Sequence, residues 1–106
     1  QEQLPHDYVL AHEQIHFSLT EIHTRRLNER ADELVRRMTT VDRDANRAIA
    51  AAEARLKRVL DEESRALLAQ NDRFDSETSL GHRPEAQRKW QQHVERELRE
   101  TERFAR

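Results

Sequence analysis

The 106-residue chain has no cysteine, only one glycine and two prolines, and few aromatic residues. Without cysteine it can form neither a disulfide framework nor a thiolate metal site. No apolar run approaches the roughly 18 residues of a membrane span. Charged and polar side chains interrupt residues 1 to 20, which therefore do not resemble a signal peptide. We expect no membrane span.

The chain also lacks a dominant charge. Its 19 basic and 21 acidic residues give a net charge of −2 and are mixed along the sequence. This pattern argues against a nucleic-acid partner and against a basic helix on a membrane surface. The lack of cysteine leaves the redox compartment open, and we favour a periplasmic or secreted location over a cytoplasmic one.

Charged residues make up 38% of the chain and apolar residues 35%, which is typical of long helices with narrow buried stripes. We expect one all-α domain over residues 1–106, a long antiparallel helical hairpin with a third, C-terminal helix. The helices should span about residues 6–38, 42–76 and 84–104, with Thr40 or Asp42 as the second N-cap and a loop at Gly81. The expected buried stripes are Ile15, Leu19, Ile22, Leu27, Ala31, Leu34 and Met38; Ala45, Ile49, Ala52, Leu56, Val59, Glu63, Ala66 and Gln70; and Trp90, Val94, Leu98 and Ala105.

The stretch YVLAHEQIHFSLT, residues 8 to 20, contains the pattern HExxH. On a helix, His12 and His16 differ by about 40° and lie roughly 6 Å apart along the axis, so both imidazoles can bind one zinc ion. Glu13 is turned about 100° away, where it can act as general base on a zinc-activated water. Because HExxH arises by chance in roughly 4% of shuffled chains of this composition, a fortuitous match is the alternative.

Two further histidines do not fit the same ion. His23 lies about 10 Å beyond His16 along a straight helix, so we expect it on the surface or in support of the ligands. In the longer HExxHxxGxxH pattern, Leu19 stands at the glycine position and Ile22 at the position of the third histidine. His6 is expected to be a solvated residue at the helix start.

A second segment, FDSETSLGHRPEAQRKW at residues 74 to 90, extends the pattern. Together with YVLAHEQIHFSLTEI at residues 8 to 22, it resembles the bacterial family called domain of unknown function nine hundred twenty-two. That family is regarded as zinc-dependent proteases of the HExxH zincin group. Its members look like HEQxHF, two long helices, a Y-D-x-E-T-x-H-G motif and a Q-x-x-W segment. The matching positions here are Phe74, Asp75, Glu77, Thr78 and Gly81, then Gln87 and Trp90.

The resemblance covers about residues 8 to 95 and implies a zinc metallopeptidase acting on a peptide or protein substrate through a zinc-activated water. This chain departs from the family at two positions, where Phe74 replaces a tyrosine and Leu80 replaces a histidine, with His82 two residues later. Family members usually carry a β-rich portion before the HExxH helix. Eleven residues precede His12, so we expect a fragment or a member without its upper lobe.

The third zinc ligand is the open question. In a hairpin that turns at about residues 40 to 41, residue n lies level with about residue 81 − n, which puts Glu63 near His16 and Asp75 roughly 9 Å past His12. We rank Asp75 first because the family motif includes it, with Glu77, Glu63 and His82 as alternates. The alternative for Asp75 and Glu77 is capping of the helix end around Gly81. Trp90 is expected in the core.

A second hypothesis is a non-catalytic all-helical structural or interaction module. In that case HEQIH is fortuitous or holds a purely structural metal, and the charged helices mediate self-association into a homo-oligomer.

Overall fold

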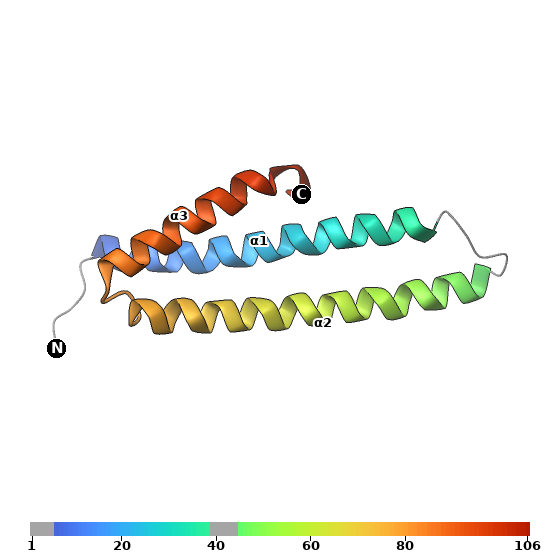
Figure 1. Ribbon diagram of the computed structural model, residues 1–106, viewed down its shortest axis with the longest axis horizontal. Coiled ribbons are helices and arrows are strands. Elements are labelled where there is room, and N and C mark those ends of the chain that lie inside the picture. Colours follow the sequence, from blue (N-terminus) through green and yellow to red (C-terminus); the bar gives the residue numbers. More distant parts are fainter. Residues whose placement is uncertain (1–5, 39–44) are drawn as a thin grey trace.

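The computed structural model describes residues 6–38 and 45–106, and over these residues it confirms the expected all-α fold. Helix α1 (His6–Met38) and helix α2 (Ala45–Thr78) run antiparallel, and α3 (Pro84–Glu100) folds back along them (Figure 1). A short 3-10 turn, Glu102–Phe104, follows. The molecule is elongated, with extents of 64 × 24 × 16 Å. None of the helices in these two described ranges is long and apolar enough to cross a membrane.

The expected first residues of α2 and its expected N-cap at Thr40 or Asp42 lie outside the described residues. Helix α2 ends at Thr78, two residues later than the expected residue 76. At this end the Thr78 side chain is buried, and its hydroxyl donates to the Phe74 carbonyl (2.7 Å). The chain then leaves the helix through positive φ angles that end at Gly81 (φ 96°), the conformation that glycine adopts without steric cost.

Helix α3 begins at Pro84, as expected, but ends at Glu100 rather than at residue 104. Thr101 stops it: its backbone leaves the helical region (φ −108°, ψ 13°), and its hydroxyl donates to the Glu97 carbonyl (2.7 Å). Ala105, which was expected on the buried face, is therefore exposed.

Two side chains of α1 donate hydrogen bonds to backbone carbonyls near the C-terminal end of the chain. Arg25 donates to the Leu98 carbonyl (2.8 Å), and Asn28 donates to the Phe104 carbonyl (3.0 Å). Both acceptors lie at the end of a helical segment, where carbonyls lack partners within the helix. The end of α3 and the 3-10 turn are thus held beside residues 25 and 28 of α1.

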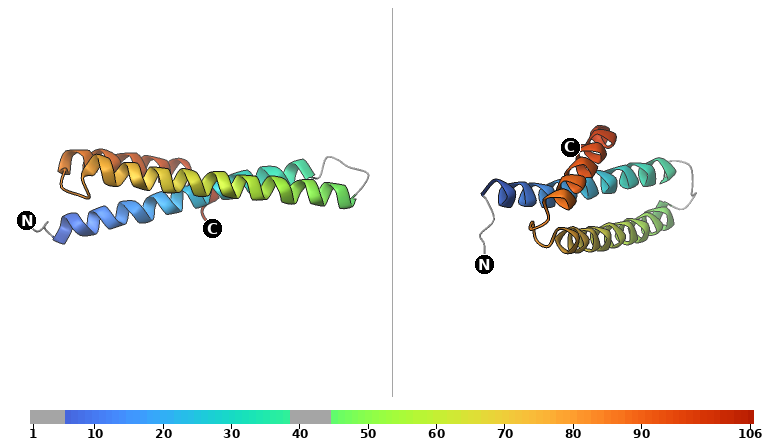
Figure 2. Two further views of the ribbon diagram at one scale, coloured as in Figure 1. Left: turned by 90° about the horizontal axis from the view of Figure 1, so that it is seen from below. Right: turned by 60° about the vertical axis from the view of Figure 1, so that its left-hand side comes forward.

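The core lies where all three helices meet, in the half of the hairpin that α3 covers (Figures 1 and 2). Its buried members are Ile15, Leu19, Ile22, Phe74, Trp90 and Val94, with Leu67 and Leu98 packed against them. The expected burial of Ile15, Leu19, Ile22 and Trp90 is confirmed, whereas Leu27, Ala31 and Leu34 of the expected first-helix stripe are only partly buried. The other half of the hairpin is a ribbon of two helices (Figure 1).

The expected α2 stripe is wrong at several positions. Ile49 and Leu56 are nearly half exposed, and Ala66 is exposed, whereas Val59 is buried. The expected stripe repeats every seven residues, but a straight helix drifts by about 20° per seven residues, so such a stripe rotates out of a straight contact line. Leu67 and Phe74, outside the expected stripe, take its place against α1 and α3.

Candidate metal centre

Three of the predicted site residues meet at one point of the hairpin. The Nε2 atoms of His12 and His16, both on α1, lie 2.8 Å and 2.7 Å from the same Oδ1 atom of Asp75 on α2. All three potential ligand atoms lie within 4.8 Å of one another. Within the described part of the chain, no other group of three such residues comes together in this way.

The predicted hairpin register is wrong, and the correction brings Asp75 to the histidines. Asp75 does not lie past the level of His12; it contacts it, and His16 contacts Asn71. Paired residue numbers thus sum to 87 at the site rather than to 81. The six-residue difference corresponds to about 9 Å at 1.5 Å per residue, which is the whole of the expected gap.

The ring of Phe74 forms the floor beneath the two histidines. The His12 ring stacks on it at a centroid distance of 4.3 Å and an interplanar angle of 22°, and the His16 ring meets it edge-on at 4.9 Å. On its other side Phe74 contacts Trp90 at 5.3 Å. Phe74 is fully buried, so the position of the family's tyrosine lies inside the core here.

The site opens to solvent on one side. The His12 side chain is 7% exposed, whereas those of His16 and Asp75 are 23% and 35% exposed. Glu13 lies next to His12 on α1 and is exposed. It is turned about 60° from His16 around the helix, toward the solvent side. Among the described residues, its carboxylate has no hydrogen-bond or ion-pair partner.

Two amide side chains that were not predicted as site residues hold the outer nitrogen of each ring. His12 Nδ1 lies 2.9 Å from Gln87 Oε1 on α3, and His16 Nδ1 is hydrogen-bonded to Asn71 Oδ1 on α2. Gln87 appeared in the sequence only as part of the Q-x-x-W resemblance. Asn71 lies one turn before Asp75 on α2, so its contact with His16 could be predicted only once the hairpin register is known.

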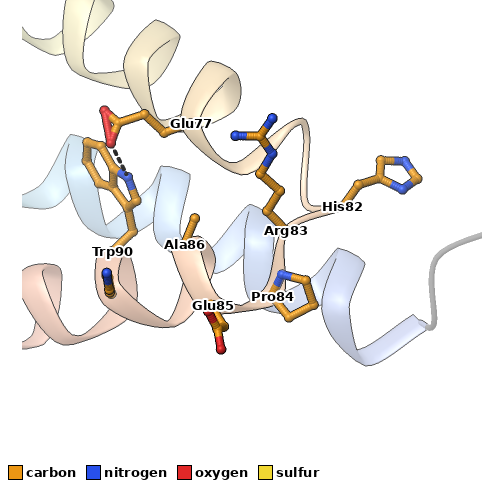
Figure 3. Close-up of a pocket in the computed structure, with 8 residues that line it drawn as sticks. Glu77, His82, Arg83, Pro84, Glu85, Ala86 and Trp90 are labelled. Carbon is orange, nitrogen blue, oxygen red and sulfur yellow. Dashed lines mark hydrogen bonds between the residues drawn. The ribbon is translucent and has the colours of Figure 1, made fainter.

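Glu77 and His82 do not join the cluster, so neither is the third ligand in this geometry. Glu77 is two residues from Asp75 and therefore turned about 200° around α2. Its carboxylate accepts from Trp90 Nε1 (3.3 Å) and pairs with Arg73. With the exposed His82, it lines a shallow hollow between α2 and α3 (Figure 3). The expected capping role of Asp75 and Glu77 is carried by backbone carbonyls instead, since Asp75 O accepts from the Leu80 N–H (2.9 Å).

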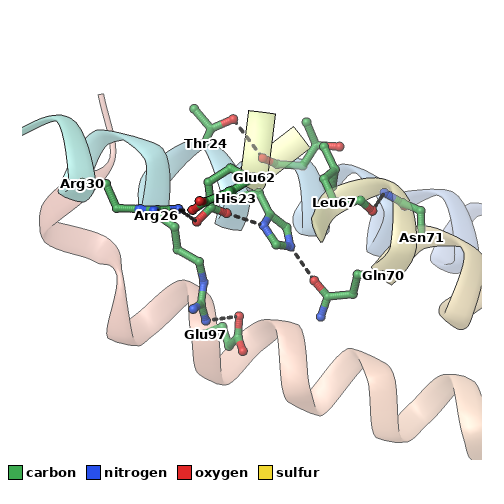
Figure 4. A network of polar contacts seen from close by, with 11 residues as sticks. His23, Thr24, Arg26, Arg30, Glu62, Leu67, Gln70, Asn71 and Glu97 are labelled. Atoms are coloured by element: carbon green, nitrogen blue, oxygen red, sulfur yellow. Dashed lines mark hydrogen bonds and ion pairs between the residues drawn. The ribbon is translucent and has the colours of Figure 1, made fainter. Parts of the chain in front are cut away.

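Glu63 is also wrong as a ligand, because it lies twelve residues or about 18 Å before Asp75 along α2. It pairs with His23 Nδ1 at 2.9 Å and with Arg30 at 3.3 Å, and His23 Nε2 lies 2.6 Å from Gln70 Oε1 (Figure 4). A hydrogen bond from Arg30 to Glu62 raises the pKa of Arg30.

These contacts place His23 in the seam between α1 and α2, with its side chain 11% exposed. It neither lies on the surface nor touches a histidine of the cluster, so both predicted roles are corrected. His6, at the start of α1, is exposed as expected. Leu80, at the position of the family's histidine, is 64% exposed with a positive φ of 57°.

No protein family, curated protein or solved structure was found to match this chain.

Proposed function

We propose that His12, His16 and Asp75 bind a zinc ion. The observation that carries the proposal is the convergence of two imidazole nitrogens on a single carboxylate oxygen at 2.8 Å and 2.7 Å. Imidazole and carboxylate are both zinc ligands, and a set of three protein ligands is typical of catalytic zinc sites.

The size of the cluster fits an ion after a small adjustment. Two ligand atoms of a tetrahedral zinc ion, with bonds of about 2.0 to 2.1 Å, lie about 3.3 Å apart. The observed separations to Asp75 Oδ1 are 2.8 Å and 2.7 Å, and all three ligand atoms lie within 4.8 Å of one another. The oxygen therefore has to move outward by about half an ångström, and the two rings have to adjust around the ion. Asp75 has room for this, because its side chain is partly exposed.

A count of donors and acceptors also favours a cation. Each of the two rings faces an oxygen atom at both of its nitrogens. A neutral imidazole has only one N–H, so it cannot donate to both oxygens. An imidazolium, which donates at both nitrogens, would satisfy these contacts, and so would a cation held by Nε2 of each ring and by Asp75, with which each ring donates only through Nδ1. The orientation of the rings therefore suits metal binding.

The finer part of the proposal is hydrolysis of a peptide bond. Zinc with three protein ligands has an open position, where it lowers the pKa of a water and polarises a carbonyl. Glu13 is exposed beside this open side, and a carboxylate there can act as general base if it reaches the water on the ion. The resemblance of HEQIH and FDSETSLG to the zincin-type family supports a peptide or protein as substrate.

The test combines metal analysis with activity, using protein purified without an affinity tag. We expect one zinc per chain in the wild type and none in His12→Ala, whereas His82→Ala, which removes an exposed histidine, keeps the metal. Glu13→Gln should retain zinc and lose cleavage of a quenched fluorescent peptide mixture. No zinc in the wild type refutes the proposed centre. Zinc without cleavage in the wild type refutes hydrolysis and leaves a metal-binding role.

A non-catalytic interaction module is the second candidate function, and one observation favours it. Ile49, Leu56 and Leu60 on α2 are large apolar side chains, and each is nearly half exposed. Sedimentation analysis over a range of protein concentrations tests this candidate. A monomer at all concentrations, together with peptide cleavage, contradicts self-association and favours the enzyme.

A further inference from the structure

The orientation of the two ring-binding amides can be assigned from their other contacts. Asn71 Nδ2 donates to the Leu67 carbonyl at 2.9 Å, and Gln87 Nε2 donates to the Tyr8 carbonyl at 3.3 Å. A carbonyl oxygen only accepts, so the nitrogen of each amide must face it. The amide oxygen is then left to face the histidine, in agreement with the contacts at His12 and His16.

This assignment fixes the position of a proton on each ring. Because an amide oxygen is only an acceptor, the ring nitrogen opposite it has to be the donor. Nδ1 of each ring therefore carries a hydrogen, and Nε2 is the atom that faces Asp75. Groups that hold the second nitrogen of a ligating histidine in this way fix its tautomer and commonly raise metal affinity by 10- to 100-fold.

We propose that Asn71 and Gln87 are positioning residues that hold both histidines with Nδ1 protonated and Nε2 directed to Asp75. This inference rests on the proposed function for its role in metal binding, but the ring orientation itself does not require a metal. The two positioning residues come from different helices. Asn71 belongs to α2, one turn before Asp75, whereas the buried Gln87 (4% exposed) belongs to α3. Metal affinity is therefore linked to the docking of α3 through His12.

The direct test is the proton position on each ring, measured by long-range 1H–15N NMR of histidine-labelled protein. We expect Nδ1 of His12 and of His16 to carry a proton both without and with zinc, whereas Nε2, which faces the Asp75 carboxylate, can carry a second proton only in the metal-free protein. In the zinc-loaded protein, only Nε2 should show the shift of a metal-bound nitrogen. The exposed His82 serves as an internal reference. A ring whose Nδ1 carries no proton in the metal-free protein, or zinc bound at Nδ1, overturns the proposal.

Substitutions test the effect on affinity. Asn71→Leu and Gln87→Leu should each weaken zinc binding by about 10- to 100-fold, whereas Asn71→Asp and Gln87→Glu, which keep an acceptor oxygen, should stay near the wild-type affinity. Gln91→Leu makes the same change one turn along α3 at an exposed position and should have no effect. Leucine variants with wild-type zinc affinity overturn the proposal. A wild type that binds no zinc but shows Nδ1–H on both rings refutes only the metal centre.

Discussion

Phe74→Ala tests the claim that the floor of the site belongs to the core. Phe74 is fully buried between the two histidines and Trp90, and a buried phenylalanine cut to alanine usually costs about 3 to 5 kcal/mol. Phe17→Ala is the matched control, because Phe17 lies one residue after His16 but is 73% exposed. A surface substitution of this kind changes stability by about 0.5 kcal/mol or less.

The assay is equilibrium unfolding in urea, followed by helical circular dichroism and by the fluorescence of Trp90, the one tryptophan. With an m value of about 2 kcal/mol/M, the midpoint should fall by about 1.5 to 2.5 M in Phe74→Ala and by about 0.25 M or less in Phe17→Ala. If Phe74→Ala is unfolded without urea, Phe74→Leu should still show a loss of about 1 to 2 kcal/mol. Equal effects of Phe74→Ala and Phe17→Ala would refute the assignment of Phe74 to the core.

Three further predictions follow from the same contacts. In thermal unfolding, zinc at about 100 times its dissociation constant should stabilise the wild type by about 2.7 kcal/mol and raise Tm by roughly 10 to 20 °C. This stabilisation should be lost in Asp75→Asn and kept in His82→Ala. Glu63→Ala removes an acceptor from His23 and Arg30 between α1 and α2, and should lower the free energy of unfolding in urea by about 1 to 3 kcal/mol. The control Glu29→Ala, at an exposed position, should lower it by about 0.5 kcal/mol or less. Similar values for the two variants would contradict a structural role of Glu63. Leu80→His introduces a histidine at a 64% exposed position, where the resembled family has one. Metal analysis should still give one zinc per chain. A second bound zinc would contradict a site formed only by ligands from α1 and α2.

The helical spacing of the two histidines could be predicted from the sequence because it depends only on local backbone geometry. Residues four apart on a helix lie on one face whatever else the chain does. The same holds for Ile15, Leu19 and Ile22, whose spacing predicted a buried stripe that the structure confirms. Local rules also predicted the loop at Gly81 and the start of α3 at Pro84.

The partner of the histidines could not be derived from the same rules, because it depends on how far α2 slides along α1. A register counted from the expected turn was wrong by six residues, and it favoured the wrong level of α2. Packing decides the register instead: Phe74 lies beneath both histidine rings and against Trp90. Phe74 was not part of the expected seven-residue stripe, so its burial against α1 and α3 could not be predicted from that stripe. Asn71 was missed for the same reason.

The resemblance to the zincin-type family contributed Asp75 as the first-ranked ligand, ahead of what hairpin geometry suggested. The structure places Asp75 beside His12 and His16, whereas Glu77 and Glu63 are engaged with Trp90 and His23. The proposed metal is tested by zinc analysis of the wild type and His12→Ala, and the proposed hydrolysis by peptide cleavage in the wild type and Glu13→Gln.

The central claim is that one zinc ion is held by His12, His16 and Asp75. The most direct measurement is anomalous diffraction at the zinc absorption edge from crystals of the untagged chain grown with equimolar zinc. The account predicts a single strong peak at about 2.0 to 2.2 Å from Nε2 of each histidine and from a carboxylate oxygen of Asp75. A zinc ion bound only at exposed histidines such as His6 or His82, with the Asp75 cluster still closed by hydrogen bonds, would contradict it.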